Sequence, residues 1–474
     1  MNQNNISAAE LFLRVRELLI LPELEPKTRN KMMHDTLILC CHEGVKETKQ
    51  AFGNLFSQVD YLCKAHGIKV ADKIAIQTMR RHSNSQEPLS SEDLKYDARA
   101  LAIFISAVFG VDVPHELNVL IPHTNRPYQK GLEINNRRIR CIVKNWDSDF
   151  IRVDIDQDAD EEEYLVQLKD EENHIDHTYL WDILKEGMQL NLLDCQVKQP
   201  VITPRLIVVE PDYLVDISSI ATCFTAFGHH PLLYLLNQMK PRANTQATLL
   251  GNFAGAALDD IINTNGKYQM NETIKTNFRE KALEFCTCPW FDAKKFYTDA
   301  NQQAFNLQQV VDILFPRTAS QAQMSAFRGE SLYDRKKAIL EPSFVCEALG
   351  IQGRVDLMTT DCKLLVEQKS GRNMNIETHQ VDPGYHSYQL EPHYVQLLLY
   401  YGVLQHNFKL SNDRVNIRLL YSKYRPQDGL MVVAYYQKLF KEAIQYRNQL
   451  VAASFEIAKE GFEHALNEFT PEVL

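Results

Sequence analysis

The sequence has few features that would place it in a membrane, outside the cell or in a disulfide-rich class. Its longest apolar stretches, TLILCC and VQLLLYYGVL, fall well short of the roughly 18 residues that cross a bilayer. The chain does not open on a basic segment followed by an apolar one, so no secretion signal is predicted. The cysteines form no CxxC pair, which is typical of reduced thiols. We therefore expect a cytoplasmic protein with no membrane partner.

Acidic residues outnumber basic ones, and the glycine-rich motif of a P-loop is absent. The formal net charge is -10 over 474 residues, which does not favour nucleic-acid binding by the chain as a whole, although a local basic patch would still permit it. No GxxxxGK[ST] motif occurs, so the sequence contains no P-loop. What the chain does have is 45% hydrophobic residues, enough for several domains with packed cores.

The spacing of apolar residues changes twice along the chain and predicts a multi-domain α+β protein. Residues 1–114 repeat apolar side chains at three- and four-residue intervals, which predicts a helical bundle. In residues 218–474, helical segments are followed by strands, a helix, two more strands and a long helix, with a helical insertion at about 260–340. Within the bundle, Arg80, Arg81 and His82 either contact phosphate or form a solvated helix face.

Residues 115–217 alternate between apolar and charged side chains, as half-buried strands do. Ile139 and Cys141, for example, alternate with Arg138 and Arg140. Five or so short strands in this length predict a small β-barrel that is OB-like. Such barrels often hold single strands with basic and aromatic side chains, although others serve only for packing. The nucleic-acid-binding candidates are Arg138, Arg140, Lys144, Trp146, Arg152 and, further along the chain, Arg354.

The segment GRVDLMTTDCKLLVEQKSG, residues 353–371, carries the strongest chemical signal. Asp356 lies on one predicted strand, and the next strand carries Glu367 and Lys369. Because residues two apart in a strand face the same way, Glu367 and Lys369 share a face and Gln368 points to the other. If the strands are neighbours, the two carboxylates can hold Mg²⁺, which polarises a phosphoryl oxygen and acidifies a bound water. The alternative is an ordinary salt bridge in the sheet.

Three motif pieces together resemble the RecB-like branch of the PD-(D/E)XK nuclease superfamily. They are GRVDLM, VEQKSG and QLLLYYGVL, the last of which contains Gln396-x-x-x-Tyr400. The resemblance implies an α/β nuclease core with a mixed sheet in residues 218–474. It implies Mg²⁺ or Mn²⁺ as the cofactor, with Asp356 and Glu367 as metal ligands. It also implies a catalytic Lys369, and Gln396 and Tyr400 as residues that shape the site.

One part of the family pattern is missing. RecB-like nucleases carry a GTxxH helix start whose histidine ligates metal, and the best match here is LLGNFAGAALDD. Aligning Gly251 with the family glycine puts Gly255 where the histidine belongs. Asp259, one turn further along the same face, is the candidate replacement ligand, although it could equally face solvent. Asp260 is the alternate, and Glu347 is a more distant candidate.

The order of the predicted domains is also similar to the N-terminal part of nuclease–helicases that trim replication flaps. The predicted barrel of this chain ends in EPDYLVDISSIATCF, and in those relatives VDISSIA leads from the barrel into the nuclease. They hold an iron–sulfur cluster through one cysteine before the core and three after the QxxxY helix. No cysteine follows Cys362 here, so no such cluster is expected. The resemblance implies single-stranded or flap DNA as substrate, and a helicase partner in cis, if the chain is part of a longer protein, or in trans.

Together these inferences predict a metal-dependent deoxyribonuclease that hydrolyses phosphodiester bonds in replication or repair. The alternative from another class is a non-catalytic nucleic-acid-binding or scaffold module that retains the nuclease fold. The absent GTxxH histidine favours that alternative, whereas the presence of Asp356, Glu367 and Lys369 argues against it. A restriction-type endonuclease would share the chemistry but would need a sequence-reading domain, and none is visible.

Overall fold

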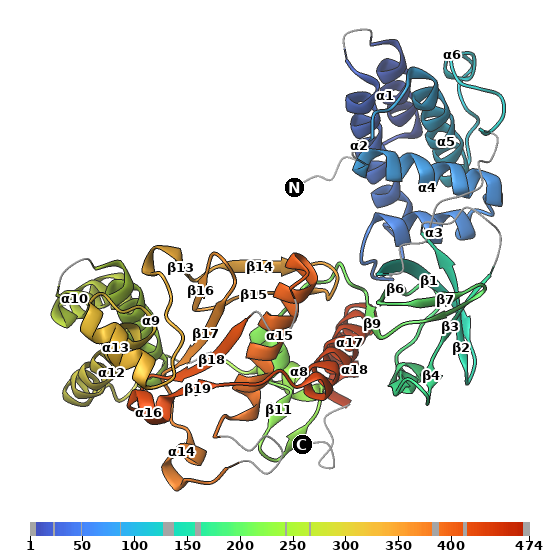
Figure 1. Cartoon of the computed structure of the whole chain (residues 1–474). Helices are drawn as coiled ribbons and strands as arrows, with labels where there is room; N and C mark the ends of the chain where they lie inside the picture. Colours follow the sequence, from blue (N-terminus) through green and yellow to red (C-terminus); the bar gives the residue numbers. More distant parts are fainter. Residues whose placement is uncertain are drawn as a thin grey trace. The chain divides into compact units, whose positions relative to one another are not determined.

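The computed structural model describes residues 6–21, 24–48, 50–85, 87–126, 137–156, 163–241, 244–264, 267–381, 388–410 and 415–467. The chain divides into two compact units, one of Met1–Tyr213 with Val451–Leu474 and the other of Leu214–Leu450 (Figure 1). Each unit contains helices and β-sheet, so the predicted α+β class is confirmed. Among the described helices, none combines the length with the apolar character that a membrane span requires.

The first unit begins with a group of helices whose ends follow local sequence signals. The Ser7 hydroxyl accepts a hydrogen bond from the Glu10 backbone N–H, and the Glu10 carboxylate accepts one from the Ser7 N–H. Ser90 and Asp93 form the same capping box at the start of α5, which ends at Gly110 in the left-handed conformation. The helices are α1 (Ala8–Ile20), α2 (Pro26–Gly44), α3 (Leu55–Ala65), α4 (Val70–Asn84), α5 (Ser91–Phe109) and α6 (His115–Asn118).

These helices share one apolar core. Leu11 of α1, Leu37 of α2 and Leu101 of α5 are completely buried in it. Leu117 and Ile121 belong to the same core, so the segment just after residue 114 packs with the helices. The burial of these side chains is the main stabilising contribution to the bundle.

A seven-stranded sheet follows the helices in the first unit, with strand order β7-β8-β3-β2-β1-β6-β9. All neighbouring pairs are antiparallel except β3 and β8. The strands are β1 (Arg138–Trp146), β2 (Phe150–Ile155), β3 (Tyr164–Gln167), β6 (Gln189–Leu193), β7 (Gln196–Lys198), β8 (Val201–Thr203) and β9 (Leu206–Val209). A short hairpin of β4 (Lys169–Asp170) and β5 (Ile175–Asp176) and a 3-10 turn (Thr178–Asp182) lie between β3 and β6.

The β-barrel predicted for residues 115–217 is wrong in one respect, because the sheet does not close. In the described part of the chain, the two outermost strands, β7 and β9, pair with no strand beyond the sheet. They are only three and four residues long, so neither reaches far enough to complete a ring. The alternating burial of β2 shows that one face of the strand is buried. Strands of an open sheet and strands of a closed barrel both have one buried face, so they share this pattern. The sequence pattern alone could not distinguish them.

The second unit begins with short elements and then becomes helical. Its first part contains β10 (Val215–Asp216), α7 (Ile217–Ala221), β11 (Phe224–Thr225), β12 (Gly228–His229), α8 (Leu232–Met239), α9 (Gln246–Asn263), α10 (Met270–Glu280), α11 (Ala282–Cys286), α12 (Ala293–Leu314) and α13 (Ala319–Phe327). The Thr245 hydroxyl caps α9, and the Asp292 carboxylate caps α12. The helices from α10 to α13 occupy the segment that the sequence predicted as a helical insertion.

Two sheets form the centre of the second unit. The larger has the order β13-β16-β17-β18-β19, and the smaller has the order β10-β15-β14. Their remaining strands are β13 (Ala338–Leu340), β14 (Ser343–Cys346), β15 (Ile351–Arg354), β16 (Leu357–Thr359), β17 (Leu364–Lys369), β18 (Asn416–Tyr421) and β19 (Leu430–Val432). Only β17–β18 and β10–β15 are parallel, so both sheets are mixed, as predicted.

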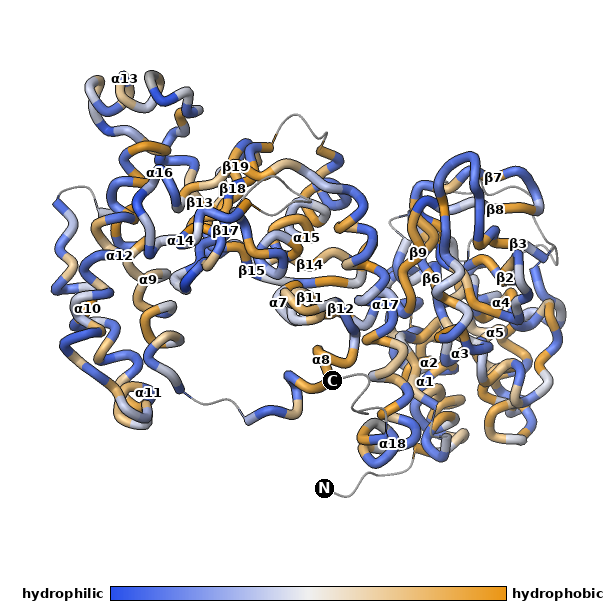
Figure 2. Tube along the Cα trace, turned by 90° about the horizontal axis from the view of Figure 1, so that it is seen from below, coloured by the Kyte–Doolittle hydropathy of each residue, from blue (hydrophilic) through white to orange (hydrophobic). Residues whose placement is uncertain are grey.

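Helices pack on both sides of the larger sheet. Leu357, Leu364, Val366 and Leu420 are buried in one core with the apolar residues of α9 and α12. Figure 2 shows the hydropathy of these helices and of the strands β17 and β18 along the chain trace. The crossover between the parallel strands β17 and β18 contains α14 (Met374–Thr378) and α15 (Glu391–Phe408), as parallel strands require a long connection. The chain then continues through α16 (Pro426–Gly429), α17 (Gln437–Glu460) and α18 (Phe462–Asn467).

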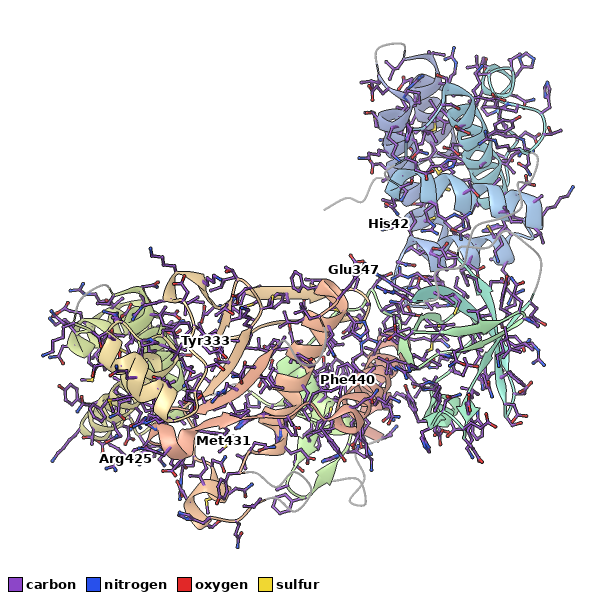
Figure 3. The ribbon with its side chains drawn as sticks, in the orientation of Figure 1. His42, Tyr333, Glu347, Arg425, Met431 and Phe440 are labelled. Carbon is purple, nitrogen blue, oxygen red and sulfur yellow. The ribbon has the colours of Figure 1, made fainter. Side chains whose placement is uncertain are left out.

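A close contact fixes α15 against α17. A Cβ atom at Gly402 of α15 would lie 2.4 Å from Cε2 of Phe440, which Figure 3 labels on α17. Only glycine permits this approach without moving the ring. The contact bears on the candidate site because α15 carries Gln396 and Tyr400.

Candidate active site

Asp356 lies where the chain passes from one sheet to the other. β15 ends at Arg354 in the smaller sheet, and β16 begins at Leu357 in the larger one. The expectation that Asp356 lies on a strand is therefore wrong. The Val355 N–H instead donates to the carbonyl of Pro342, and Pro342 has no N–H with which to continue a ladder. The proline thus helps to interrupt the strand at the candidate ligand.

The register of β16 and β17 brings the two predicted metal ligands together. Leu357 pairs with Val366 in an antiparallel ladder, so the next pair in the same register is Asp356 and Glu367. Residues directly opposite each other share a sheet face and have Cβ atoms about 5 Å apart. Glu367 is only 3% exposed, whereas Asp356 is half-buried. Two carboxylates thus meet at one end of the ladder.

Lys369 joins this pair from the same face of β17. Its Nζ donates to Oε1 of Glu367 and to Oε1 of Gln396, each at 2.8 Å. Gln396 is almost buried on α15, so the helix fixes the lysine from the side opposite the sheet. The sequence prediction that Glu367 and Lys369 share a face agrees with this hydrogen bond.

Gln368 points to the other face of the sheet and holds the strand in place. Its Nε2 donates to Oγ of Ser422, which in turn donates to Oε1 of Gln303 on α12, both at 2.7 Å. All three side chains are buried. Its backbone N–H donates to Oδ2 of Asp356 at 2.5 Å. Gln368 therefore connects α12, through its side chain, to the candidate ligand Asp356, through its backbone.

Tyr400 supports the site through the backbone. Its hydroxyl donates to the carbonyl of Arg354 at 2.7 Å, two residues before Asp356. A Cβ atom at Gly353 would lie 2.9 Å from Cε1 of Tyr400, which explains why glycine precedes Arg354 in GRVD. Burial raises the pKa of Tyr400, so its phenol stays protonated and acts as a donor.

The carboxylic acids in this region have raised pKa values. Burial, and then the charge of Asp356, raise the pKa of Glu367 to about 8 despite the opposing effect of Lys369. Burial also raises the pKa of Asp356, while the Gln368 N–H and Lys369 oppose that shift. Neighbouring acids whose pKa values are raised by burial and by each other are candidates for a functional site.

Asp259 and Asp260, the two candidate replacements for the missing histidine, lie in different surroundings. Burial, followed by Glu341 and Asp356, raises the pKa of Asp259 to about 7, so Asp259 lies in the field of the candidate site. Asp260 is exposed, and its Oδ2 accepts a hydrogen bond from Thr273 at 2.5 Å. A Cβ atom at Gly255 would meet no described atom within 4 Å, so there is open space where the family has its histidine side chain. Asp259 is the better placed of the two.

The carboxylate oxygens of these residues are the type of ligand that a hard divalent cation prefers. Oε2 of Glu367 is buried and makes no hydrogen bond, which leaves a carboxylate oxygen available for a cation. In the described part of the chain, no three His, Cys, Asp or Glu side chains are already gathered closely enough to hold a metal. Asp356, Glu367 and Asp259 would therefore need side-chain rotation to share one ion.

Substitution of the two aspartates should separate their roles. We expect Asp259→Asn to weaken Mn²⁺ binding about tenfold or more, because it removes a candidate ligand charge. Asp260→Asn, one residue along the same helix, is the matched control and should bind Mn²⁺ like the wild type. Isothermal titration with Mn²⁺ measures both. Equal weakening by the two variants would remove Asp259 from the site.

The nucleic-acid candidates on the first unit's sheet are mostly engaged by carboxylates. Arg140 makes two bonds of 2.9 Å to Asp212, Lys144 lies 2.6 Å from Asp154, and Arg152 lies 3.1 Å from Asp147. Trp146 is half-buried against the sheet core, and Arg138 is the half-buried first residue of β1. Arg354, which belongs to the second unit, lies beside the candidate active site, where it pairs with Glu341 at 3.1 Å.

The helical candidates for phosphate contact are likewise engaged. Arg80 Nη2 lies 2.5 Å and Arg81 Nη1 3.6 Å from Oδ1 of Asp156. His82 Nδ1 lies 2.9 Å from the buried Asp97. Because Arg80 is nearly buried, neither the phosphate-contact interpretation nor the solvated-face interpretation describes it. These side chains stabilise the first unit internally.

Glu347 lies away from the candidate site. β14 and β15 form a hairpin in which Ser343 pairs with Arg354 and Cys346 with Ile351, so Glu347 lies in the connecting turn (Figure 3). Asp356 follows the opposite end of the hairpin. Glu347 is therefore wrong as an alternate ligand, and the same pairing brings Glu341 to the site instead.

Sequence reasoning missed two residues near the site. Glu341 lies in a turn, outside any periodic pattern, and only the hairpin register places its N–H 3.0 Å from the Asp356 carbonyl. His393 precedes Gln396 by one helical turn, and that spacing could have indicated it. Burial, with a contribution from Lys369, lowers the pKa of His393 to about 4, so a neutral imidazole lies near the lysine.

Comparison with known proteins adds no family. No protein-family model matches the sequence. No curated protein matches it either.

Proposed function

We propose that this chain is a divalent-metal-dependent deoxyribonuclease that hydrolyses phosphodiester bonds in single-stranded DNA or flaps. One observation carries the proposal: among the described residues, Glu367 keeps a buried oxygen with no hydrogen-bond partner, next to Lys369 and beside Asp356, which precedes the ladder of β16 and β17. Burying a carboxylate is costly unless it is paired or binds metal. The lysine neutralises only one of the two carboxylate oxygens by direct contact.

The residues divide into ligands and positioning groups. Asp356 and Glu367, with Asp259, would hold Mg²⁺ or Mn²⁺, and the bound cation would polarise the phosphate and activate water. Lys369 has three N–H donors, of which two are used in the described structure. The third is available to a phosphate oxygen or to the attacking water. Gln396 orients the lysine, and Tyr400 fixes the backbone before Asp356.

The preference for single-stranded or flap DNA, and for a helicase as partner, rests on the resemblance of the motifs. The paired cations of the first unit's sheet do not strengthen it. The second candidate function is a scaffold or nucleic-acid-binding module without catalysis. The observation that favours it is that no three ligand-type side chains are gathered among the described residues.

The test is cleavage of end-labelled single-stranded, flap and duplex DNA by the wild-type chain. We expect cleavage with Mg²⁺ or Mn²⁺ and none after chelation with EDTA, with recovery when the metal is restored. A Lys369→Met preparation, purified in parallel, controls for contaminating nucleases. If the wild type cleaves no substrate with either metal, the scaffold function replaces the nuclease.

A further inference from the structure

Glu341 occupies an unusual place beside the candidate site. It lies in the turn between β13 and β14 with a φ of 49°, a conformation that residues other than glycine seldom adopt. Its N–H donates to the carbonyl of Asp356 at 3.0 Å. The two backbones are thus joined directly, and the Glu341 side chain begins next to a candidate ligand.

The Glu341 carboxylate has one cationic partner. Nη1 of Arg354 lies 3.1 Å from its Oε2, and both side chains are substantially exposed, 61% for Arg354 and 41% for Glu341. An ion pair this exposed is weak and easily broken. The Arg354 backbone, by contrast, is held by Tyr400 and by pairing with Ser343, so its side chain can move while its Cα stays in place.

The pairing of Leu340 with Leu357 and the backbone hydrogen bond from Glu341 to Asp356 place Glu341 beside Asp356. Burial is the largest cause of the raised pKa of both Asp259 and Asp356; Glu341 adds to each shift and Arg354 opposes each. Lys369 also opposes the shift at Asp356. Independently of these charges, Glu367 contributes a side chain that is 4% exposed, with Oε2 buried and unpartnered. Arg354 pairs with Glu341 and not with Glu367, so the arginine does not neutralise this oxygen. The buried oxygen therefore points to a bound cation other than Arg354.

We propose that Glu341 is a further carboxylate ligand of the cation site and that Arg354 is its exchangeable counter-ion. This inference rests on the proposed metal-dependent function. Without a cation, the guanidinium neutralises Glu341. With a divalent cation in the site, Glu341 would serve the cation in place of the guanidinium, which would leave Arg354 available to contact a phosphate of the substrate.

The experiment is a titration of the full chain with Mn²⁺, in the absence of DNA, followed by electron paramagnetic resonance of the free ion. We expect Glu341→Gln to bind Mn²⁺ about tenfold more weakly, as loss of a ligand or its support does elsewhere. Arg354→Gln should bind Mn²⁺ several-fold more tightly, because it removes a competing cation. Glu347→Gln, at the other end of the same hairpin, should match the wild type.

The double variant distinguishes competition from a general electrostatic effect. If Arg354 competes only for Glu341, Arg354→Gln should not tighten Mn²⁺ binding in a Glu341→Gln background. Equal tightening in both backgrounds would contradict the exchange. Unchanged binding by Glu341→Gln would overturn its role as ligand. Circular dichroism and thermal melting confirm that each variant is folded.

Failure of this inference and failure of the proposed function give different results. Cleavage by the wild type, together with unchanged Mn²⁺ affinity in Glu341→Gln, rejects only the role of Glu341. Mn²⁺ binding that depends on Glu341 but is accompanied by no cleavage rejects the nuclease and keeps the cation site. Absence of any Mn²⁺ binding by the wild type rejects both.

Discussion

Replacement of Lys369 by methionine should lower the rate of DNA cleavage by about a thousandfold, the loss that follows removal of one preorganised donor from an active site. Methionine keeps the length and apolar stem of lysine but has no N–H. The variant therefore loses both bonds that tie Nζ to Glu367 and Gln396, and the third donor proposed for phosphate or water. Initial rates on single-stranded DNA with saturating Mg²⁺ measure the loss.

Lys363 provides the matched control. It is exposed immediately before β17, whereas Lys369 ends the same strand. Lys363→Met removes the same charge from the residue just before the strand without touching the site, and its cleavage rate should stay close to that of the wild type. A similar fall in both variants would mean that general loss of positive charge matters, and it would remove the special role of Lys369.

Without a divalent cation, the protein should become less stable as the pH rises from about 4.5 to about 8, because the pKa of Glu367 is raised across this range in the folded state. An acid with a raised folded pKa contributes stability below its unfolded pKa, and that contribution is lost as the pH rises through its folded pKa. The shift of Glu367 corresponds to a few kcal/mol of unfolding free energy. Asp259, with a pKa of about 7, adds to the loss in the same direction.

Urea unfolding followed by circular dichroism, at pH 5, 6, 7 and 8 in EDTA, measures this dependence. Glu367→Gln cannot ionise, so its stability should fall less over the same range. Added Mg²⁺ should stabilise the wild type more at pH 8 than at pH 6, because the cation binds the ionised carboxylates. Parallel pH profiles for the wild type and Glu367→Gln would contradict the buried-acid explanation. Glu347→Gln serves as the exposed control.

Strand periodicity predicted which face of β17 each polar side chain takes, because alternation is a local rule. In β17, alternation alone sets Glu367 and Lys369 on one face and Gln368 on the other, and the hydrogen bonds to Gln396 and Ser422 agree with it. The helical spacing of Gln396 and Tyr400 is equally local. Both patterns depend on a few neighbouring residues and on no distant contact.

Features that depend on pairing between distant segments could not be predicted in this way. The break before Asp356 requires Pro342 to lie opposite Val355, and the sequence does not specify that register. The role of Glu341 follows from the same register, which also removes Glu347 from the site. The unclosed sheet of the first unit is a further case, since edge pairing is decided by strand length and curvature rather than by alternation.

The charge pairs of the first unit show why cationic residues in a strand pattern are weak evidence for nucleic-acid binding. The alternation of apolar and charged residues identifies Arg140, Lys144 and Arg152 as cationic strand residues. It does not identify their acidic partners, which lie elsewhere in the chain. Their net contribution to a phosphate-binding field is reduced by those partners. Arg354, beside the candidate site and in an exposed pair, is the better candidate for contact with substrate.

The most direct test of the central claim is the cleavage rate of Glu367→Gln relative to wild type, on single-stranded DNA with Mg²⁺. Glutamine keeps the shape of the buried side chain and removes only its charge and one acceptor oxygen. The proposed metal site predicts a fall of about a thousandfold or more, with thermal stability retained or increased at pH 8. A folded Glu367→Gln variant that cleaves DNA as fast as the wild type would contradict the claim.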